Sequence, residues 1–309
     1  MKKKYVYILM FLSLFIGLVG CTAEEEREVM DLRIEFVNNR NLVRSRFIED
    51  ANLASPNGLL FDGAYIYIAD TEKNQVVVYD KYGEFVRFLG NGDIEFNLPI
   101  AISINDYGEI FVAERSTGIV RVIADDIQID EIFIDEIRDG MTYVTDIEID
   151  LQGNIYISVL SFNSSNQRIF VINEQRELIT IGENNVGILG RDETGGIFFA
   201  QTYEVFEESI GSGNSFFSRI VDNEFVEKNV LPYRYAPASI FSRNGLIYTF
   251  SHGMTQLDVF DIEGNYIETI FEEVASSSNT GLFYIIPFLD SFLVTDRESG
   301  VVYIIRDAE

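Results

Sequence analysis

The sequence predicts an all-β protein, a six-bladed β-propeller whose blades are four-stranded antiparallel sheets. Three observations support this prediction: a short alternating motif recurs six times, each copy is flanked by further β-rich runs, and no stretch after residue 30 has the pattern of a helix of normal length. A four-stranded unit repeated every 40–50 residues or so is typical of propeller blades.

The repeated motif is a hydrophobic run of period two that ends in a small or polar residue, as a half-buried strand should. The last residues of successive copies lie 44, 45, 42, 50 and 45 positions apart. We expect each copy to form the second strand of a blade. The copies are YIYIAD (65–70), EIFVAE (109–114), NIYISV (154–159), GIFFAQ (196–201), LIYTFS (246–251) and SFLVTD (291–296).

The other strands of each blade are predicted around this motif. A first strand precedes it, often near a proline, as in NLPIAISIND (97–106), and a third follows it, as in QVVVYD (75–80). A fourth strand is expected after an acidic or glycine turn, clearly in KYGEFVRFLG (81–90) and IEGNYIETIF (262–271) and more weakly in EQRELITIG (174–182) and DNEFVEKNV (222–230). In the fourth blade, residues 201–215 are expected to form the longest internal loop.

The two ends of the chain predict how the ring closes. The sixth unit reaches Asp307 after its third strand, and two spare β-rich runs, 33–37 and 42–48, precede the first unit. One of these runs is expected to supply the missing outer strand of the last blade, because closure removes an exposed strand edge. We therefore assign the propeller to residues 32–309. An open solenoid with capped ends is the alternative.

The first 20 residues are predicted to be a signal peptide. Three lysines at 2–4 precede an apolar run at 5–19, which is too short for a comfortable membrane span. The run leads into Leu18-Val19-Gly20-Cys21, which resembles the lipobox of bacterial lipoproteins. This resemblance implies cleavage before Cys21 and acylation of its thiol and amine. The alternative is an ordinary signal peptide followed by an incidental cysteine.

The charge and the cysteine content indicate which partners and which cellular location are plausible for this protein. Residues 21–31 are acidic and have no β pattern, so we expect a tether between the lipidated Cys21 and the propeller. A formal net charge of −27 repels phosphate backbones and argues against nucleic-acid binding. With Cys21 as its single cysteine, the chain has no disulfide to stabilise it. We expect a protein of the bacterial cell envelope, anchored to a membrane by lipid and extracytoplasmic.

The blade sequences resemble the NHL-repeat family of six-bladed propellers. The best copies are 56–90 (PNGLLFDGAYIYIADTEKNQVVVYDKYGEFVRFLG) and 98–123 (LPIAISINDYGEIFVAERSTGIVRVI), and the resemblance covers residues 50–307 or so. It implies the fold. It does not imply one function, because propellers of this kind include lyases, lactonases, hydrolases, sensors and binding platforms.

The face that carries the ends of the second strands is the predicted place for a binding site, because loops on a rigid scaffold often carry binding groups. Asp70, Glu114 and Asp296 end three of the repeated motifs and are candidate binding residues there. Their recurrence at matching positions favours a structural role, in which an acid caps a turn by accepting backbone N–H groups. The inter-blade linker GNGDIEFN (90–97) is expected on the same face.

Two loop segments add candidate binding residues. Tyr233, Arg234 and Tyr235 offer stacking and hydrogen bonding suited to sugars, peptides or carboxylates, although ordinary loop packing is the alternative. His252 is the only histidine, which excludes a three-histidine zinc site within one chain. It is a candidate rim residue, or simply a solvated loop residue.

A calcium site is the remaining possibility for chemistry in the central channel. Lactonases of the gluconolactonase and paraoxonase type resemble this protein in architecture and bind Ca²⁺ through Glu, Asn and Asp of inner strands. Asn57 in PNGLL resembles one such asparagine, but the other motifs of that ligand set are missing. A turn asparagine is the alternative interpretation.

These observations favour a non-catalytic, lipid-anchored propeller that binds a small ligand or an envelope protein, with no cofactor. The alternative is a Ca²⁺-dependent hydrolase or lactonase of the gluconolactonase-like type. A third hypothesis is a structural subunit of an envelope complex whose rim docks other proteins.

Overall fold

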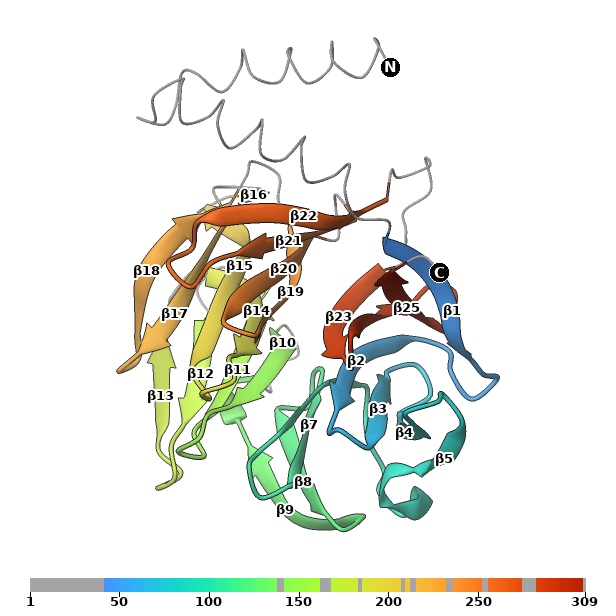
Figure 1. The fold of residues 1–309 in the computed structure, drawn as a ribbon. Helices are drawn as coiled ribbons and strands as arrows, with labels where there is room; N and C mark the ends of the chain where they lie inside the picture. Colours follow the sequence, from blue (N-terminus) through green and yellow to red (C-terminus); the bar gives the residue numbers. More distant parts are fainter. Residues whose placement is uncertain are drawn as a thin grey trace, which may run out of the picture.

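The fold is an all-β propeller of six blades (Figure 1). The computed structural model describes residues 42–137, 142–161, 168–182, 185–206, 209–211, 215–231, 236–251, 255–273 and 282–307. Within these ranges, the helices are two short 3₁₀ turns, η1 (Leu89–Gly92) and η2 (Asp135–Ile137). The predicted fold class is confirmed.

Each blade runs from an inner strand beside the propeller axis to an outer strand at the periphery. We number the blades in chain order. Blade 1 has β2 (Pro56–Phe61), β3 (Tyr65–Asp70), β4 (Gln75–Asp80) and β5 (Phe85–Phe88); blade 2 has β6 (Pro99–Ile104), β7 (Ile110–Glu114), β8 (Ile119–Ala124) and β9 (Ile127–Phe133); blade 3 has β10 (Thr142–Ile149), β11 (Ile155–Ser161), β12 (Arg168–Ile172) and β13 (Leu178–Ile181); blade 4 has β14 (Asn185–Arg191), β15 (Ile197–Phe206), β16 (Ser209–Gly211), β17 (Phe216–Val221) and β18 (Glu224–Val230); blade 5 has β19 (Pro237–Arg243), β20 (Leu246–Ser251), β21 (Gln256–Phe260) and β22 (Tyr266–Glu272); blade 6 has β23 (Leu282–Phe288), β24 (Ser291–Asp296), β25 (Val301–Asp307) and β1 (Leu42–Glu49).

The inner strands form a complete ring. Strand β2 packs beside β6, β6 beside β10, β10 beside β14, β14 beside β19, β19 beside β23, and β23 beside β2. The outer strand of blade 6 is β1, which pairs antiparallel with β25 from Leu42 opposite Asp307 to Glu49 opposite Val301. The run 42–48 therefore lies in the sheet of the last blade. The other spare run, 33–37, lies outside the described residues.

The hydrophobic core lies between neighbouring blades, because both faces of most blades are covered by another sheet. One cluster joins Val78 of blade 1 to Val112 of blade 2, and another joins Ile68 of blade 1 to Leu293 of blade 6; all four side chains are fully buried. This packing explains why the second and third strands are apolar at almost every position rather than at alternate ones.

Glycines let inner strands of neighbouring blades approach closely. A Cβ added at Gly190 of β14 would lie 1.9 Å from the carbonyl oxygen of Ile240 in β19. A Cβ added at Gly58 of β2 would lie 2.8 Å from the carbonyl oxygen of Ile100 in β6. Neither glycine has a positive φ, so the requirement is for space and not for backbone freedom.

Part of the excess of acidic residues is used in the hairpin turns. Asp150, between β10 and β11, accepts hydrogen bonds from the backbone N–H groups of Gln152 (2.9 Å) and Asn154 (2.8 Å). Asp192 makes the same pair of contacts in the β14–β15 turn, with Thr194 and Gly196. These turns depend on a short side chain that folds back on its own backbone.

Two sequence expectations about individual strands differ from the structure. The loop predicted at 201–215 is wrong in part, because β15 continues to Phe206 and pairs with β16, Glu204 lying opposite Gly211. Its sequence TYEVF has the alternation of a strand, which outweighs the polar residues around it. In blade 2, the sequence pattern did not reveal the outer strand β9. No helix in the described part of the chain has the length and hydropathy of a membrane span.

Candidate functional site

Asp70 and Glu114 anchor the backbone segments that enter their own blades. The fully buried Asp70 carboxylate accepts hydrogen bonds from the N–H groups of Ala54 (2.8 Å) and Ser55 (2.9 Å). The equally buried Glu114 accepts one from the N–H of Asn97 at 3.1 Å. Both acids therefore hold the fold together in the way a turn-capping residue does, and a role in binding stays a prediction.

Asp296 of blade 6 also bonds to backbone. Its Oδ1 accepts the N–H groups of Glu298 and Ser299, both at 3.1 Å, and its exposed fraction is 8%. Five other predicted residues lie outside the described residues, so their roles also stay predictions: Cys21, Tyr233, Arg234, Tyr235 and His252.

Asn57 is placed as a structural residue of β2. Its side-chain amide donates to the Thr71 hydroxyl at 2.7 Å and to the Ser55 carbonyl at 3.0 Å, and the side chain is buried. Across the described residues, His, Cys, Asp and Glu side chains do not gather in a group of three or more that could hold a metal ion. A calcium role for Asn57 therefore stays a prediction.

A different polar group lies at the propeller axis, on the inner strand of blade 3. Asp146 and Glu148 stand two residues apart on β10, so their side chains share one face of the strand. The alternate residues Ile147 and Ile149 are fully buried on the other face. Asp146 is 1% exposed, whereas Glu148 is partly exposed. The two carboxyl groups thus differ in their access to solvent.

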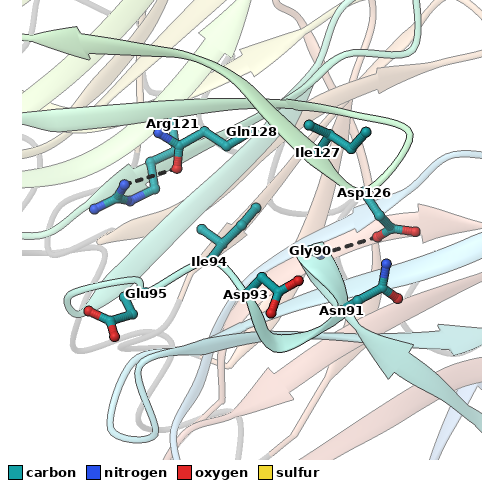
Figure 2. A pocket seen from close by; sticks show the side chains of 9 residues that line it. All are labelled: Gly90, Asn91, Asp93, Ile94, Glu95, Arg121, Asp126, Ile127 and Gln128. Carbon is teal, nitrogen blue, oxygen red and sulfur yellow. Dashed lines mark hydrogen bonds between the residues drawn. The ribbon is translucent and has the colours of Figure 1, made fainter.

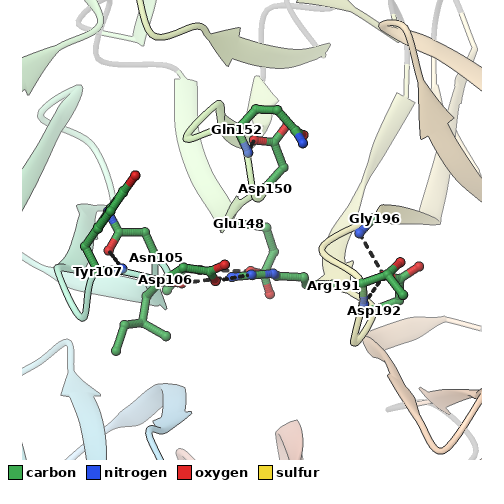
Figure 3. Close-up of polar contacts among 12 residues, drawn as sticks. Asn105, Asp106, Tyr107, Glu148, Asp150, Gln152, Arg191, Asp192 and Gly196 are labelled. Atoms are coloured by element: carbon green, nitrogen blue, oxygen red, sulfur yellow. Dashed lines mark hydrogen bonds and ion pairs between the residues drawn. The ribbon is translucent and has the colours of Figure 1, made fainter.

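Glu148 belongs to a network that joins blades 2, 3 and 4. Its Oε2 accepts a hydrogen bond from the Ser103 hydroxyl at 2.8 Å. Arg191, at the end of β14, donates to the Ile104 carbonyl at 3.1 Å and pairs with Asp106 at 2.6 Å. Figure 3 shows the side chains of Asp106, Glu148 and Arg191 directed toward one another from these three blades. The charge of Arg191 also acts on Glu148.

Both oxygens of the Asp146 carboxylate accept backbone hydrogen bonds. Its Oδ2 accepts the N–H of Leu189 in blade 4 at 2.9 Å, and its Oδ1 accepts the N–H of Ile147 at 2.9 Å. The Tyr284 side chain reaches the axis from blade 6, on the opposite side of the ring, and interacts electrostatically with the same carboxyl group. Tyr284 is itself partly exposed. Its side chain therefore comes close to the carboxyl groups of blade 3 from the opposite blade.

The surroundings favour the neutral forms of all three acidic groups. Burial raises the pKa of Glu148 to about 7, against the opposing effects of the Ser103 hydroxyl and the Arg191 charge. Burial, followed by the neighbouring charge of Glu148, raises the pKa of Asp146 well above its usual range. Burial and the two carboxylates raise the pKa of Tyr284 in the same way.

This arrangement can exchange protons near neutral pH and can orient a polar molecule. Glu148 is the group best placed to do so, because it combines a pKa near 7 with partial exposure. Tyr284 offers a hydroxyl donor, and Arg191 offers a guanidinium that favours carboxylates and phosphates. We call Ser103, Asp146, Glu148, Arg191 and Tyr284 the axis cluster.

Sequence reasoning missed the axis cluster although one signal was present. The segment TDIEID (145–150) alternates acids with isoleucines in a first strand, where a propeller has little room for charge. Acids alternating with aliphatic residues on an innermost strand indicate carboxyl groups at the axis. Tyr284, Ser103 and Arg191 carry no comparable signal, because only the closed ring brings blades 2, 4 and 6 to one place.

Comparison with known proteins places the fold but not the family. No protein-family model and no curated protein sequence matches this chain. Among solved structures it resembles a gluconolactonase from Xanthomonas campestris (TM-score 0.63, 9% identity, 88% of this chain and 92% of that one). It also resembles a luciferin-regenerating enzyme (0.62, 12%, 86% and 95%) and a streptogramin B lyase (0.58, 12%, 87% and 98%). At these identities the likeness shows a shared six-bladed architecture.

Proposed function

We propose that this chain is a lipid-anchored, extracytoplasmic β-propeller that binds a small polar ligand at its axis cluster. The observation that carries the proposal is the environment of Glu148, a partly exposed residue at the axis whose carboxyl pKa is raised by desolvation to about 7. Structural acids elsewhere, such as Asp70, are instead fully buried and bonded to backbone N–H groups through both oxygens.

The composition of the site supports a small ligand. A few polar groups converge at the axis from four blades, whereas the alternate residues Ile102 and Ile147 point the other way into the core between blades. Small-molecule sites orient their ligands with a few polar groups of this kind.

A second candidate function is acid–base catalysis at the same cluster. It is favoured by the pKa of Glu148, because a general acid or base works best when its pKa lies near the working pH. The names of the similar structures, a gluconolactonase and a streptogramin B lyase, point in the same direction. If this chain hydrolyses gluconolactone, Glu148→Gln should lower the rate by about 100-fold or more, and added Ca²⁺ should not be required.

Ligand binding can be tested by thermal shift with four chemically different probes: gluconolactone, glucose, glutamate and spermidine. We expect at least one to raise the melting temperature, because a ligand that binds only the folded state stabilises it. Glu148→Gln and Tyr284→Phe should each remove most of that shift. Asp222→Asn, in the distant β17–β18 turn, is the control and should leave it intact. A shift that survives both axis substitutions, or none with any probe, would count against the axis site.

The lipid anchor can be tested separately through Cys21. Growth of cells with an alkyne-tagged palmitate should label the wild-type protein, because the lipobox resemblance implies acylation of this residue. Cys21→Ala should abolish the label, and the neighbouring change Ser13→Ala should preserve it. A wild-type protein that takes up no label, or a Cys21→Ala variant that keeps it, would contradict the anchor.

A further inference from the structure

An open cavity of about 610 Å³ lies at the periphery, between blades 1 and 2 and away from the axis. Figure 2 shows its lining residues, which come from the segment after β5 on one side and from β8 and β9 on the other. We call it the blade 1–2 cavity. It is lined by Gly90, Asn91, Asp93, Ile94, Glu95, Arg121, Asp126, Ile127 and Gln128.

The two arginines beside this cavity are already neutralised. Arg121 donates to Glu114 at 2.7 Å and to Glu131 at 2.8 Å, and its side chain is 15% exposed. Arg87 pairs with Asp126 at 2.7 Å. These contacts fix one wall of the cavity, and among the residues that line it no cationic side chain is left to pair with further acids.

Two carboxylates at the mouth have no counter-ion. Asp93 and Glu95 are exposed, and no ion pair to either is present in the described part of the chain. Ile94 lies between them in sequence and folds over Gly90, whose added Cβ would lie 2.4 Å from the Ile94 side chain. The mouth is therefore acidic, with an aliphatic surface beside it.

An exposed apolar edge continues from the cavity along β9. Ile127 is 65% exposed, Ile129 is 52% exposed and Phe133 is 54% exposed. Strand β9 is the outer edge of blade 2, so one side of its backbone is unpaired by any other strand of the sheet. A small cation would fill the acidic mouth without covering these side chains. An extended peptide would reach both.

We propose that the blade 1–2 cavity and the edge of β9 dock an extended, basic segment of another protein, with Lys or Arg side chains at the acidic mouth and apolar side chains on Ile127 and Ile129. Charge complementarity selects this occupant. A second copy of this chain carries a net charge of −27 and would be repelled. The inference is independent of the axis cluster and of any ligand bound there.

The test uses fluorescence anisotropy with a labelled heptapeptide of alternating Lys and Val residues. We expect binding that weakens as salt rises from 50 to 200 mM, because exposed charges are screened. The variant Asp93→Asn/Glu95→Gln should weaken binding about tenfold, which corresponds to ~1.4 kcal/mol. Ile129→Ser should weaken it about threefold. All three residues are exposed, so we expect the variants to fold, and their melting temperatures verify this.

The matched control is Asp222→Asn/Glu263→Gln, which removes the same charge from two exposed turns of blades 4 and 5. It should weaken binding less than twofold. Equal losses in the two double variants would show diffuse attraction and overturn the proposal. Undetectable binding of the peptide would also overturn it. A third outcome would also overturn the proposal: a peptide with Ser in place of Val binds equally well, and spermidine displaces it. The site would then bind a small amine and not an extended peptide.

Discussion

In the wild-type protein, titration of Glu148 should lower the free energy of unfolding by about 2.5 kcal/mol between pH 5 and pH 8, and Glu148→Gln should abolish this decrease. The folded protein keeps Glu148 protonated up to a pKa of about 7, whereas the unfolded chain ionises it near 4.5. Between these values the folded state binds more protons than the unfolded state, so stability falls as the pH rises and levels off above about pH 7. Glutamine resembles the protonated acid and does not titrate.

The comparison is made by urea unfolding of both proteins across this pH range. At pH 5 the two should be similar in stability, because Glu148 is then neutral in the folded protein and glutamine can still accept the Ser103 hydrogen bond. At pH 8 the variant should be the more stable. Glu263→Gln, at an exposed turn, controls for the loss of one acid and should follow the wild type. Parallel curves for wild type and Glu148→Gln would show that this group is not held neutral.

Replacing Gly190 by alanine should lower the free energy of unfolding by about 2–3 kcal/mol, the upper part of the usual range for overpacking a core. The added Cβ would lie 1.9 Å from the carbonyl oxygen of Ile240, which is backbone and cannot rotate away. The inner strands of blades 4 and 5 would have to separate. Arg191 and Leu189 flank Gly190 on β14 and both contact the groups at the axis, so the change should also weaken ligand binding there.

Gly245→Ala is the control for this substitution. Gly245 has a φ of +73° in the β19–β20 turn, with no atom within 4 Å of an added Cβ, so alanine there meets backbone strain of about 1 kcal/mol but no clash. Urea unfolding should rank Gly190→Ala as clearly the less stable of the two. The reverse order would mean that the ring tolerates wider spacing between inner strands than the structure indicates.

The fold could be predicted from the sequence because the motif of one blade is repeated six times. Alternation in motifs such as YIYIAD depends on local strand geometry, and the spacing of the copies reports one blade each. Strand β9 (IQIDEIF) was not anticipated because its alternation is short: it starts as IQID but breaks at Asp130-Glu131, next to a bulge in the pairing with β8. Peripheral strands are constrained on one side only, so their patterns are weaker.

The candidate site was predictable only in part. Asp70 and Glu114 were predicted because acids recur at matching positions of the repeat. Such recurrence indicates a structural role shared by blades, here an acceptor for the backbone N–H groups of the segment that enters the blade. A ligand site has the opposite property, because it uses different residues from different blades. Tyr284 and Asp146 are 138 positions apart in the chain and meet only because blades 3 and 6 face each other across the closed ring.

The central claim is that Glu148 is a protonatable group at the ligand site. It is tested most directly by NMR of protein labelled with ¹³C at the glutamate carboxyl carbons, with Glu148→Gln used to assign the resonance. We expect this resonance to titrate near pH 7 and to shift when the stabilising probe from the thermal-shift experiment is added. A midpoint near 4.5, or a resonance that does not move when that probe binds, would contradict the account.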